Sequence, residues 1–328
     1  MARVTREGQR TFWHLRGTGR VPSEYEIVST RLIHFGPGRF EVNTPIAEWY
    51  ARHHAERALA LPDWDAFCDP ERFTYAAYVA RRRDDELFVQ RLFEADQLAL
   101  SAHGRSSEQL ALYRDAVGPL RFPCHGLAMA SAYVAHLAPG SRLMIALCFQ
   151  SADEVRRVQR LAHRLWMLPA QATSAAGAPS NGQARALWQE HPAWQPLRRA
   201  IEVLLCTYGW AEAFTSLHVV LKPAIDRVVF GALERAAERV GDRALAQVLA
   251  ALSRDGAWHR ECTGELVRGL VRHERANFET LRRCASAARP SAREAVSALA
   301  PVLGEESGTL ESAFDSDYER TLKELELV

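Results

Sequence analysis

The sequence predicts an all-α protein built as a bundle of long helices. Over much of the chain, apolar residues recur at steps of three and four, the spacing that gathers them on one face of a helix. No alternation of strand, turn and helix appears, so a doubly wound sheet is not expected. With 328 residues, 48% of them hydrophobic and 25% charged, the composition is typical of a globular protein with a large core.

Charge and hydropathy exclude several classes of function. The 41 Lys and Arg residues nearly balance the 40 Asp and Glu residues, which argues against a nucleic-acid reader built on bulk charge. The most apolar stretch, residues 127–138, is too short for a membrane span, and the charged N-terminus leads into no apolar signal core. We therefore expect a cytoplasmic protein without a nucleic-acid or membrane partner. Six cysteines without a CxxC pair are expected to be reduced, mostly buried thiols.

Residues 1–44 are expected to form an extended arm. They combine glycines and prolines with aromatic residues and show no sustained helical period. The arm carries too much apolar surface to remain in water, so it should lie on its own body or on a partner.

Residues 45–303 are predicted to form the helical domain. Its first helix opens at Pro45. The second should begin with Asp69 as the capping residue and Pro70 at the first helical position, and should run to about Leu100. A third should run over residues 107–138, through Pro119 and Pro123.

A fourth helix is predicted over residues 141–168. Val155, Val158, Ala162 and Leu165 recur at helical steps and predict its core face, which leaves the face of Arg156, Arg157 and Arg160 to solvent. Residues 170–184 are small and polar and predict a mobile loop, to which no function is assigned.

The remaining elements follow a similar pattern. A fifth helix is predicted over residues 197–221, with a kink at Lys222-Pro223 and a continuation to residue 240. After a short turn, further helices are expected over 243–273 and 276–288, and another from Pro290. Residues 304–328 form an acidic C-terminal tail whose end is compatible with a helix.

A metal centre is not predicted. A helical bundle that binds two irons needs two Glu-x-x-His pairs and two further glutamates on facing helices. No glutamate in this chain is followed by histidine three positions later, and residues 53–56 carry only a reversed imitation. Glu212 and His218 are six residues apart and do not share one helix face.

Other catalytic motifs are also missing. There is no GxGxxG, GxxxxGK[ST], GxSxG or HExxH. Four histidines are interpreted as core or boundary residues: His125, His136, His163 and His218. Residues 258–261 are interpreted as a polar cluster that links helices. No catalytic, cofactor-binding or metal-binding residue is therefore assigned. The residues alone describe a helical subunit with an adhesive arm and a partner.

Several segments, in order along residues 11–275, resemble one family. They are Arg20–Thr30, Asp63–Pro70, Thr74–Tyr78, Met129–Pro139, Trp194-Gln195, Tyr208–Phe214, Lys222-Pro223, Asp255–His259 and Leu266-Val267. The chain resembles the beta, or small oxygenase, subunit of the bacterial multicomponent di-iron monooxygenases that hydroxylate toluene, xylene, phenol, alkenes and methane. It is most similar to the toluene-type branch.

This resemblance implies a ferritin-like fold, related to that of ribonucleotide reductase, that has kept the bundle without its di-iron centre. It implies partner alpha and gamma subunits in an (alpha-beta-gamma)2 hydroxylase, with the di-iron centre in alpha. An effector protein and a ferredoxin or reductase that draws electrons from NADH would serve this complex. One atom of O2 would be inserted into an aromatic, alkene or alkane substrate on the alpha subunit. We expect the subunit interface to include Trp13, Arg20, Tyr25, Trp49, Tyr50 and Trp64.

Two alternatives stay open at this point. A self-contained ferritin-like metal oxidase would build an irregular site from a nearby histidine and some of Glu86, Glu154, Glu202 and Glu212. A helical regulator would instead bind a small molecule in an internal pocket and form a stable homodimer. The self-contained metal oxidase would bind iron as an isolated chain.

Overall fold

The computed structural model describes residues 15, 20–30, 48–49, 52–53, 58–103, 105–168 and 180–328, with only the backbone described for 98–103. The N-terminal half contains α1 (Glu24–Ser29), η3 (Trp64–Ala66), α3 (Tyr75–His103), α4 (Ser107–Leu112), η4 (Tyr113–Val117), α5 (Gly118–His136) and α6 (Ser141–Trp166). Then follow α8 (Asn181–Glu190), η5 (Pro192–Trp194), α9 (Gln195–Leu205), α10 (Trp210–Phe214), η6 (Thr215–Leu221), η7 (Ala224–Val229), α11 (Phe230–Arg239), α12 (Arg243–His273), α13 (Arg275–Ser297), α14 (Ala300–Leu303) and α15 (Ser307–Glu324).

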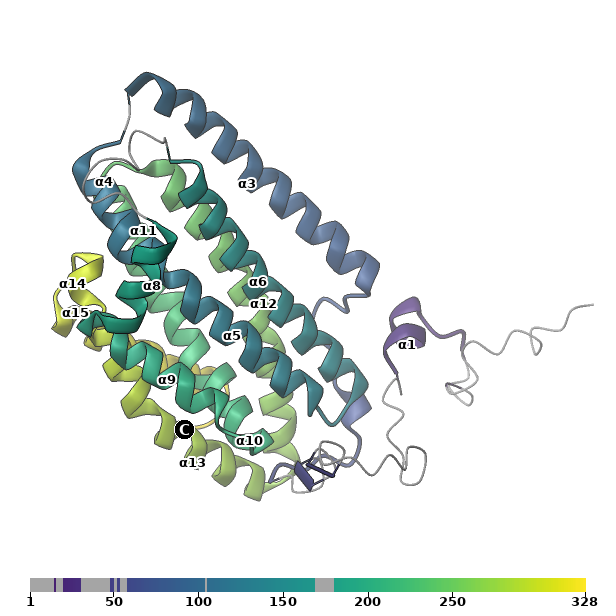
Figure 1. Cartoon of the computed structure of the whole chain (residues 1–328). Coiled ribbons are helices and arrows are strands. Elements are labelled where there is room, and N and C mark those ends of the chain that lie inside the picture. Colours follow the sequence, from purple (N-terminus) through teal and green to yellow (C-terminus); the bar gives the residue numbers. More distant parts are fainter. Residues whose placement is uncertain are drawn as a thin grey trace, which may run out of the picture.

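The predicted all-α architecture is confirmed for these residues, which contain no strand. The long helices lie side by side, with α5 and α6 adjacent in the middle and α3 along the outside of the bundle (Figure 1). None of the described helices combines the length and the hydropathy that a membrane span requires.

Several predicted helix boundaries are wrong, for local reasons. α3 begins at Tyr75 rather than after Pro70, because the Asp69 carboxylate accepts the backbone N–H of Phe73 in a turn where Arg72 has a φ of 51°. Thr74 then supplies the cap, its hydroxyl accepting the N–H of Ala77 at 3.2 Å. The capping residue therefore lies five positions later than the sequence suggested.

Other segments also differ from the predictions. Helix α8 begins inside the loop predicted over residues 170–184, and the helix predicted over residues 197–221 is interrupted between α9 and α10. The predicted arm contains a short helix, α1, held by a capping box in which Ser23 and Glu26 bind each other's backbone N–H. A helix of six residues is too short to show a helical period of apolar residues in the sequence. The expected helix start at Pro290 is absent, because α13 continues through it with buried residues such as Ala285 and Ala292 on both sides. Core packing outweighs the missing proline N–H at this position.

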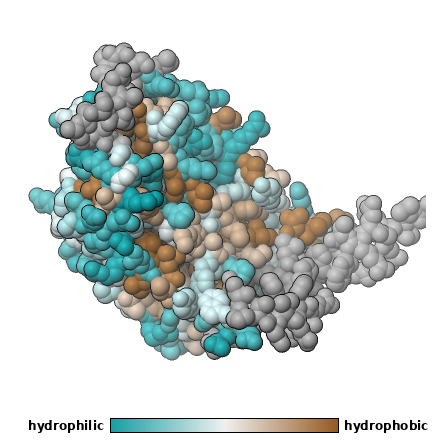
Figure 2. All heavy atoms as spheres, viewed as in Figure 1, coloured by the Kyte–Doolittle hydropathy of each residue, from teal (hydrophilic) through white to brown (hydrophobic). Residues whose placement is uncertain are grey.

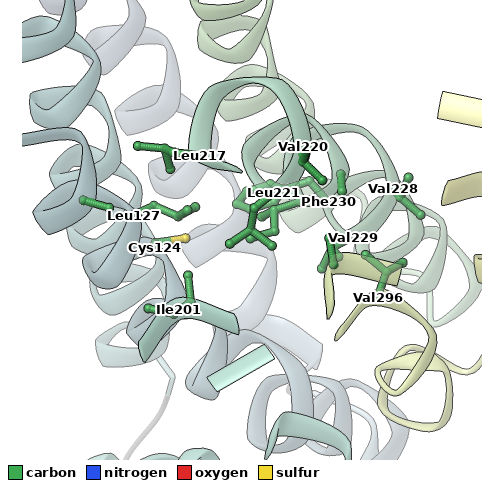
Figure 3. Packing of buried hydrophobic residues seen from close by; sticks show 14 of the residues in the cluster. Cys124, Leu127, Ile201, Leu217, Val220, Leu221, Val228, Val229, Phe230 and Val296 are labelled. Carbon is green, nitrogen blue, oxygen red and sulfur yellow. The ribbon is translucent and has the colours of Figure 1, made fainter. Parts of the chain in front are cut away.

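The core is one continuous cluster in which α5, α9, η6, η7, α11 and α13 meet (Figure 3). Around the Lys222-Pro223 step, where a kink was predicted, the helix takes π-helical hydrogen bonding on both sides. Such wide turns are often found at functional sites.

The C-terminal acidic segment belongs to the helical body. It forms α15, and Leu310, Phe314, Tyr318 and Leu322 on this helix are buried in the same core cluster. Asp315 of this helix is half-buried and pairs with Arg289 and Arg293, whereas Asp317 is buried and pairs with Arg227. An amphipathic pattern therefore accounts for a segment that the charge count alone marked as a tail.

The cysteines are free thiols, as expected. Cys124, Cys262 and Cys284 are buried, whereas Cys148 and Cys206 are exposed and Cys68 is half-buried. The expectation of mostly buried thiols therefore holds for half of them.

A buried acidic cap fixes the start of α12. The Asp242 carboxylate accepts the backbone N–H of Leu245 at 2.9 Å and the hydroxyl of Tyr113 at 2.6 Å. Arg105 and Arg164 pair with the same carboxylate at 2.8 and 3.1 Å. One side chain thus joins α12 to α6 and to the α4–η4 segment.

Gly126 marks the closest approach of α5 to α9. A Cβ added here would lie 2.4 Å from Cγ2 of buried Ile201, an atom fixed next to the backbone. We expect Gly126→Ala to lower the free energy of unfolding by about 1–3 kcal/mol, because this overlap outweighs the helix propensity gained. Gly269→Ala, with open space around its Cβ, should instead add up to about 1 kcal/mol. Urea denaturation of both variants measures the difference, and equal shifts would contradict close packing at Gly126.

Candidate functional site

A layer of buried charge crosses the middle of the bundle, where a helical bundle usually carries apolar side chains. Its centre is formed by four residues, Glu154 and Arg157 of α6, Lys222 between η6 and η7, and Asp226 of η7. We call these four the central quartet. Their side chains are at most 2% exposed. Burying charge at this depth is unfavourable unless each group is paired.

Every charge in the central quartet is paired. Arg157 binds the carboxylates of Asp226 and, at 3.0 Å, Glu154. Lys222 binds Glu154 and lies 3.3 Å from the second oxygen of Asp226. Arg157 also donates to the carbonyl of Leu252 on α12 at 3.2 Å. Two cations and two anions sum to zero, so the quartet is neutral as a unit.

A second set of charged residues lies beside the quartet, on the side of α3. Arg82 of α3 pairs with Asp153 at 2.8 Å and with Asp255 of α12 at 2.6 Å. Arg156 of α6 binds the other oxygen of Asp255. His259 of α12 contacts Asp153 through Nε2 at 2.9 Å. This outer set ties the outlying helix α3 to α6 and α12.

The pKa values follow from burial and from these neighbours. Burial alone would raise the pKa of Asp226, but Arg157 and Lys222 outweigh it and hold that pKa well below its usual range. Burial, with the cations Lys222 and Arg157, holds the pKa of His259 well below its ordinary value. At neutral pH the imidazole of His259 is therefore neutral, while Asp226 and Arg157 are charged.

The helix spacing at this centre resembles that of a metal site, but its chemistry does not. Glu154 with Arg157, and Gly256 with His259, each lie three residues apart, as in a Glu-x-x-His pair. A Cβ at Gly256 would lie 2.5 Å from an Asp226 oxygen, so this position faces the centre. A guanidinium therefore stands where a histidine would bind, and a glycine where a carboxylate would.

A di-iron or other metal centre does not fit these residues. Within the described ranges, no group of three or more His, Cys, Asp or Glu side chains is placed to hold a metal ion. The carboxylates of the quartet already bind Arg157 and Lys222, and any metal ion would face both buried cations. The arrangement can hold fixed charge and join helices, and it offers no open coordination position.

The four glutamates of the oxidase alternative do not come together. Glu154 is in the quartet, and Glu86 pairs with Arg156 and Arg160 at the edge of the outer set. Glu202 and Glu212 lie on the surface, more than half exposed. The self-contained oxidase is therefore not supported.

The extent predicted for α6 is close to the observed one, but its predicted core and solvent faces are wrong. Arg157 and Arg156 were assigned to solvent and are buried, while Val155, assigned to the core, is 41% exposed. Hydropathy cannot identify a helix face that is buried through ion pairs. A usable signal was present in the Glu154-x-x-Arg157 spacing and in Lys222, one of only two lysines, four residues before Asp226.

The predicted polar cluster of residues 258–261 is confirmed as a link between helices, through His259 and Asp153. Among the other histidines, His125 and His136 are exposed, His163 is half-buried against the ring of Phe93, and His218 is buried.

The residues predicted for a subunit interface are distributed as follows. Trp13 and Tyr50 lie outside the described residues. Arg20 pairs with Glu26 of α1. Tyr25 is buried against the guanidinium of Arg142.

The two remaining candidates lie among aromatic rings. Trp49 contacts the rings of Tyr133 and Tyr208, and Trp64 packs edge-on against Trp210 at 5.8 Å. Tyr25 and Trp64 therefore also serve the packing of this chain. Their role in an interface stays a prediction.

Comparisons with known proteins agree with the helical fold. Residues 47–274 match the methane/phenol/alkene hydroxylase family. The chain is 31% identical over 277 residues to the toluene-4-monooxygenase system hydroxylase component subunit beta of Ectopseudomonas mendocina, covering 82% of this chain and 83% of that one.

Solved structures give the same result. A structure of toluene 4-monooxygenase with toluene bound in its resting active site superposes with a TM-score of 0.79 at 29% identity, over 87% of this chain and 95% of that chain. Phenol hydroxylase from Pseudomonas sp. OX1 shares the fold, with a TM-score of 0.80 at 20% identity over 94% and 91% of the two chains. The ferritin-like fold is confirmed, and the chain belongs to the methane, phenol and alkene hydroxylase family.

Proposed function

We propose that this chain is the non-catalytic beta subunit of a multicomponent hydrocarbon monooxygenase, nearest to the toluene-type branch. One observation carries the proposal. The centre of the bundle, where related folds hold metal, is filled by the ion pairs of Arg157 and Lys222 with Glu154 and Asp226. The similarity to a toluene monooxygenase beta subunit gives such a metal-free bundle a role, as the scaffold of a catalytic partner.

In this proposal the cofactor and the chemistry belong to the alpha subunit. Its di-iron centre supplies the oxygen chemistry that inserts one atom of O2 into an aromatic, alkene or alkane substrate. Electrons come from NADH through a reductase and a ferredoxin, in the presence of an effector protein. Two alpha-beta-gamma units form the hydroxylase, which works in the cytoplasm. The beta chain supplies a rigid helical surface for alpha.

The surface of the chain is suited to a stable partner. Large apolar side chains are exposed on several helices, among them Tyr75 at 73%, Trp166 at 80% and Val203 at 61%. Figure 2 shows hydrophobic areas between hydrophilic ones on one face of the molecule. Solvent-facing aromatic and aliphatic groups of this kind mark interaction sites when they gather. We place the contact with alpha along the arm of residues 1–44 with Arg20, Trp49 and the other predicted interface residues.

Metal analysis and an oxygenase assay test the proposal. The chain purified alone should contain no stoichiometric iron and show no turnover with NADH and O2. After co-expression with the oxygenase genes that neighbour its own, it should co-purify with an iron-containing complex that oxidises hydrocarbons. Stoichiometric iron and turnover in the lone chain would contradict the scaffold role. Repeating the co-purification without residues 1–44 measures the contribution of the arm, and an unchanged yield of complex would exclude it.

A further inference from the structure

A groove lined by charged side chains lies on the surface outside the central quartet, between η7, α12 and α15. It encloses about 400 Å³. Three arginines line it, Arg227 of η7 with Arg260 and Arg268 of α12, and buried His218 also contributes to its wall. Two exposed or half-exposed glutamates, Glu261 and Glu324, complete the charged lining.

The α12 side of the groove has a regular pattern. Gly256, Arg260, Gly264 and Arg268 follow one another at steps of four, so all four share one helix face. A Cβ at Gly256 would lie 2.9 Å from an Arg260 nitrogen, and one at Gly264 would lie 2.7 Å from an Arg268 nitrogen. Each arginine therefore folds back over the glycine one turn before it. Glycine inside a helix lowers stability relative to alanine, and here that loss makes room for two guanidinium groups on one face.

Of the three arginines, Arg260 is the least neutralised. Arg268 binds Glu265 at 2.6 Å, and Arg227 binds Asp317 and Glu324 at 3.1 and 3.2 Å. Among the residues that the structure describes, the nearest carboxylate oxygen to Arg260 is on Asp226 at 4.0 Å.

That Asp226 carboxylate is already shared by Arg157 and Lys222 in the central quartet. The side chain of Arg260 is only 22% exposed, so water replaces the missing acceptor incompletely.

His218 lies in the wall of the same groove. It is 3% exposed, and its Nε2 is buried and has no hydrogen-bond partner among the described residues. The charged groups that act on this imidazole, Lys222 and Asp226, belong to the central quartet. Arg260, the half-buried cation, is therefore the group of this groove that is open to a ligand.

We propose that this groove binds a small free oxyanion of the phosphate class. Guanidinium groups bind phosphate oxygens through paired N–H donors, and Arg260 is the principal contact because it lacks a close carboxylate. Arg268 and Arg227 supply further positive charge from two sides. The volume admits inorganic phosphate or a small phosphate ester. The site is distinct from the scaffold role, and its failure would leave that role untouched.

Isothermal titration of the full chain with inorganic phosphate tests the site, with sodium chloride at matched ionic strength as the reference. We expect saturable binding that Arg260→Gln weakens about tenfold or more. Arg272→Gln is the matched control, since Arg272 lies on the same helix outside the groove and is 68% exposed. It should bind as the wild type does. Gly264→Ala, which displaces the Arg268 guanidinium, should also weaken binding, and circular dichroism confirms that each variant is folded.

Three results would overturn the proposal. The first is a response to phosphate no larger than the response to chloride. The second is equal phosphate affinity of the Arg260→Gln and Arg272→Gln variants. The third is a chain that does not bind phosphate while Arg260→Gln reduces its co-purification with partner subunits. In that case the groove receives a carboxylate of a partner protein and holds no free anion.

Discussion

Replacing Arg157 with methionine is expected to lower the free energy of unfolding by about 3–5 kcal/mol, the usual effect of removing one partner from a buried ion pair. The variant leaves Lys222 as the remaining cation of the quartet, so the quartet changes from neutral to a net charge of −1 in a buried interior. Methionine keeps most of the aliphatic stem, so lost packing contributes little. Urea denaturation followed by circular dichroism measures the change.

Arg199→Met is the matched control for this substitution. Arg199 is 65% exposed and lies 3.8 Å from Glu294, so its loss should change stability by less than about 0.5 kcal/mol. The double variant Arg157→Met with Asp226→Asn removes one charge of each sign and should regain part of the stability. Similar losses for Arg157→Met and Arg199→Met, or a double variant less stable than the sum of its single changes, would show that charge balance does not hold the centre together.

Acid is expected to destabilise the chain through His218, by about 2–3 kcal/mol between pH 7 and pH 4.5. Burial, followed by the nearby ammonium of Lys222, lowers the pKa of His218 to about 3, against about 6.5 in the unfolded chain. Between these two values the unfolded state binds one more proton than the folded state. Stability therefore falls as the pH falls from 6.5 towards 3, at up to about 1.4 kcal/mol per unit.

The variant His218→Gln isolates this contribution. Its stability should decline less than that of the wild type over the same pH range, by the stated amount. The comparison is needed because burial also raises the pKa of Asp153 and Asp255. These raised pKa values increase stability as the pH falls, opposite to the effect of His218, and they are present in both the wild type and His218→Gln. Val220→Ala, a buried neutral change in η6, should lower stability at all pH values and keep the wild-type slope. Equal slopes in wild type and His218→Gln would refute the buried neutral histidine.

The long helices could be predicted from sequence because their apolar period is a direct consequence of burying one face. The run from residue 107 to 136 and helix α6 follow that rule closely in their extent. The residues at which helices begin were harder to predict. Asp69 and Thr74 are both good caps, and the turn around Arg72, which decides between them, depends on backbone geometry that composition does not report.

The candidate site was harder to predict for a different reason. Arg157 and Lys222 are charged, and hydropathy assigns every charged residue to solvent. Their burial depends on carboxylates from other helices that meet them only in the folded chain, such as Asp226, 69 residues from Arg157. The missing Glu-x-x-His pairs were visible in the sequence, whereas what fills their place was not.

The central quartet obtains its positive charges without any component added after synthesis. A bundle with a metal at its centre depends on delivery of the ion after synthesis, and it can lose that ion to a chelator or to competition from another metal. Here the positive charges are side chains, so they arrive with the polypeptide and cannot be removed from it. The charge balance of this interior is therefore set at translation, and it stays the same in iron-rich and iron-starved cells.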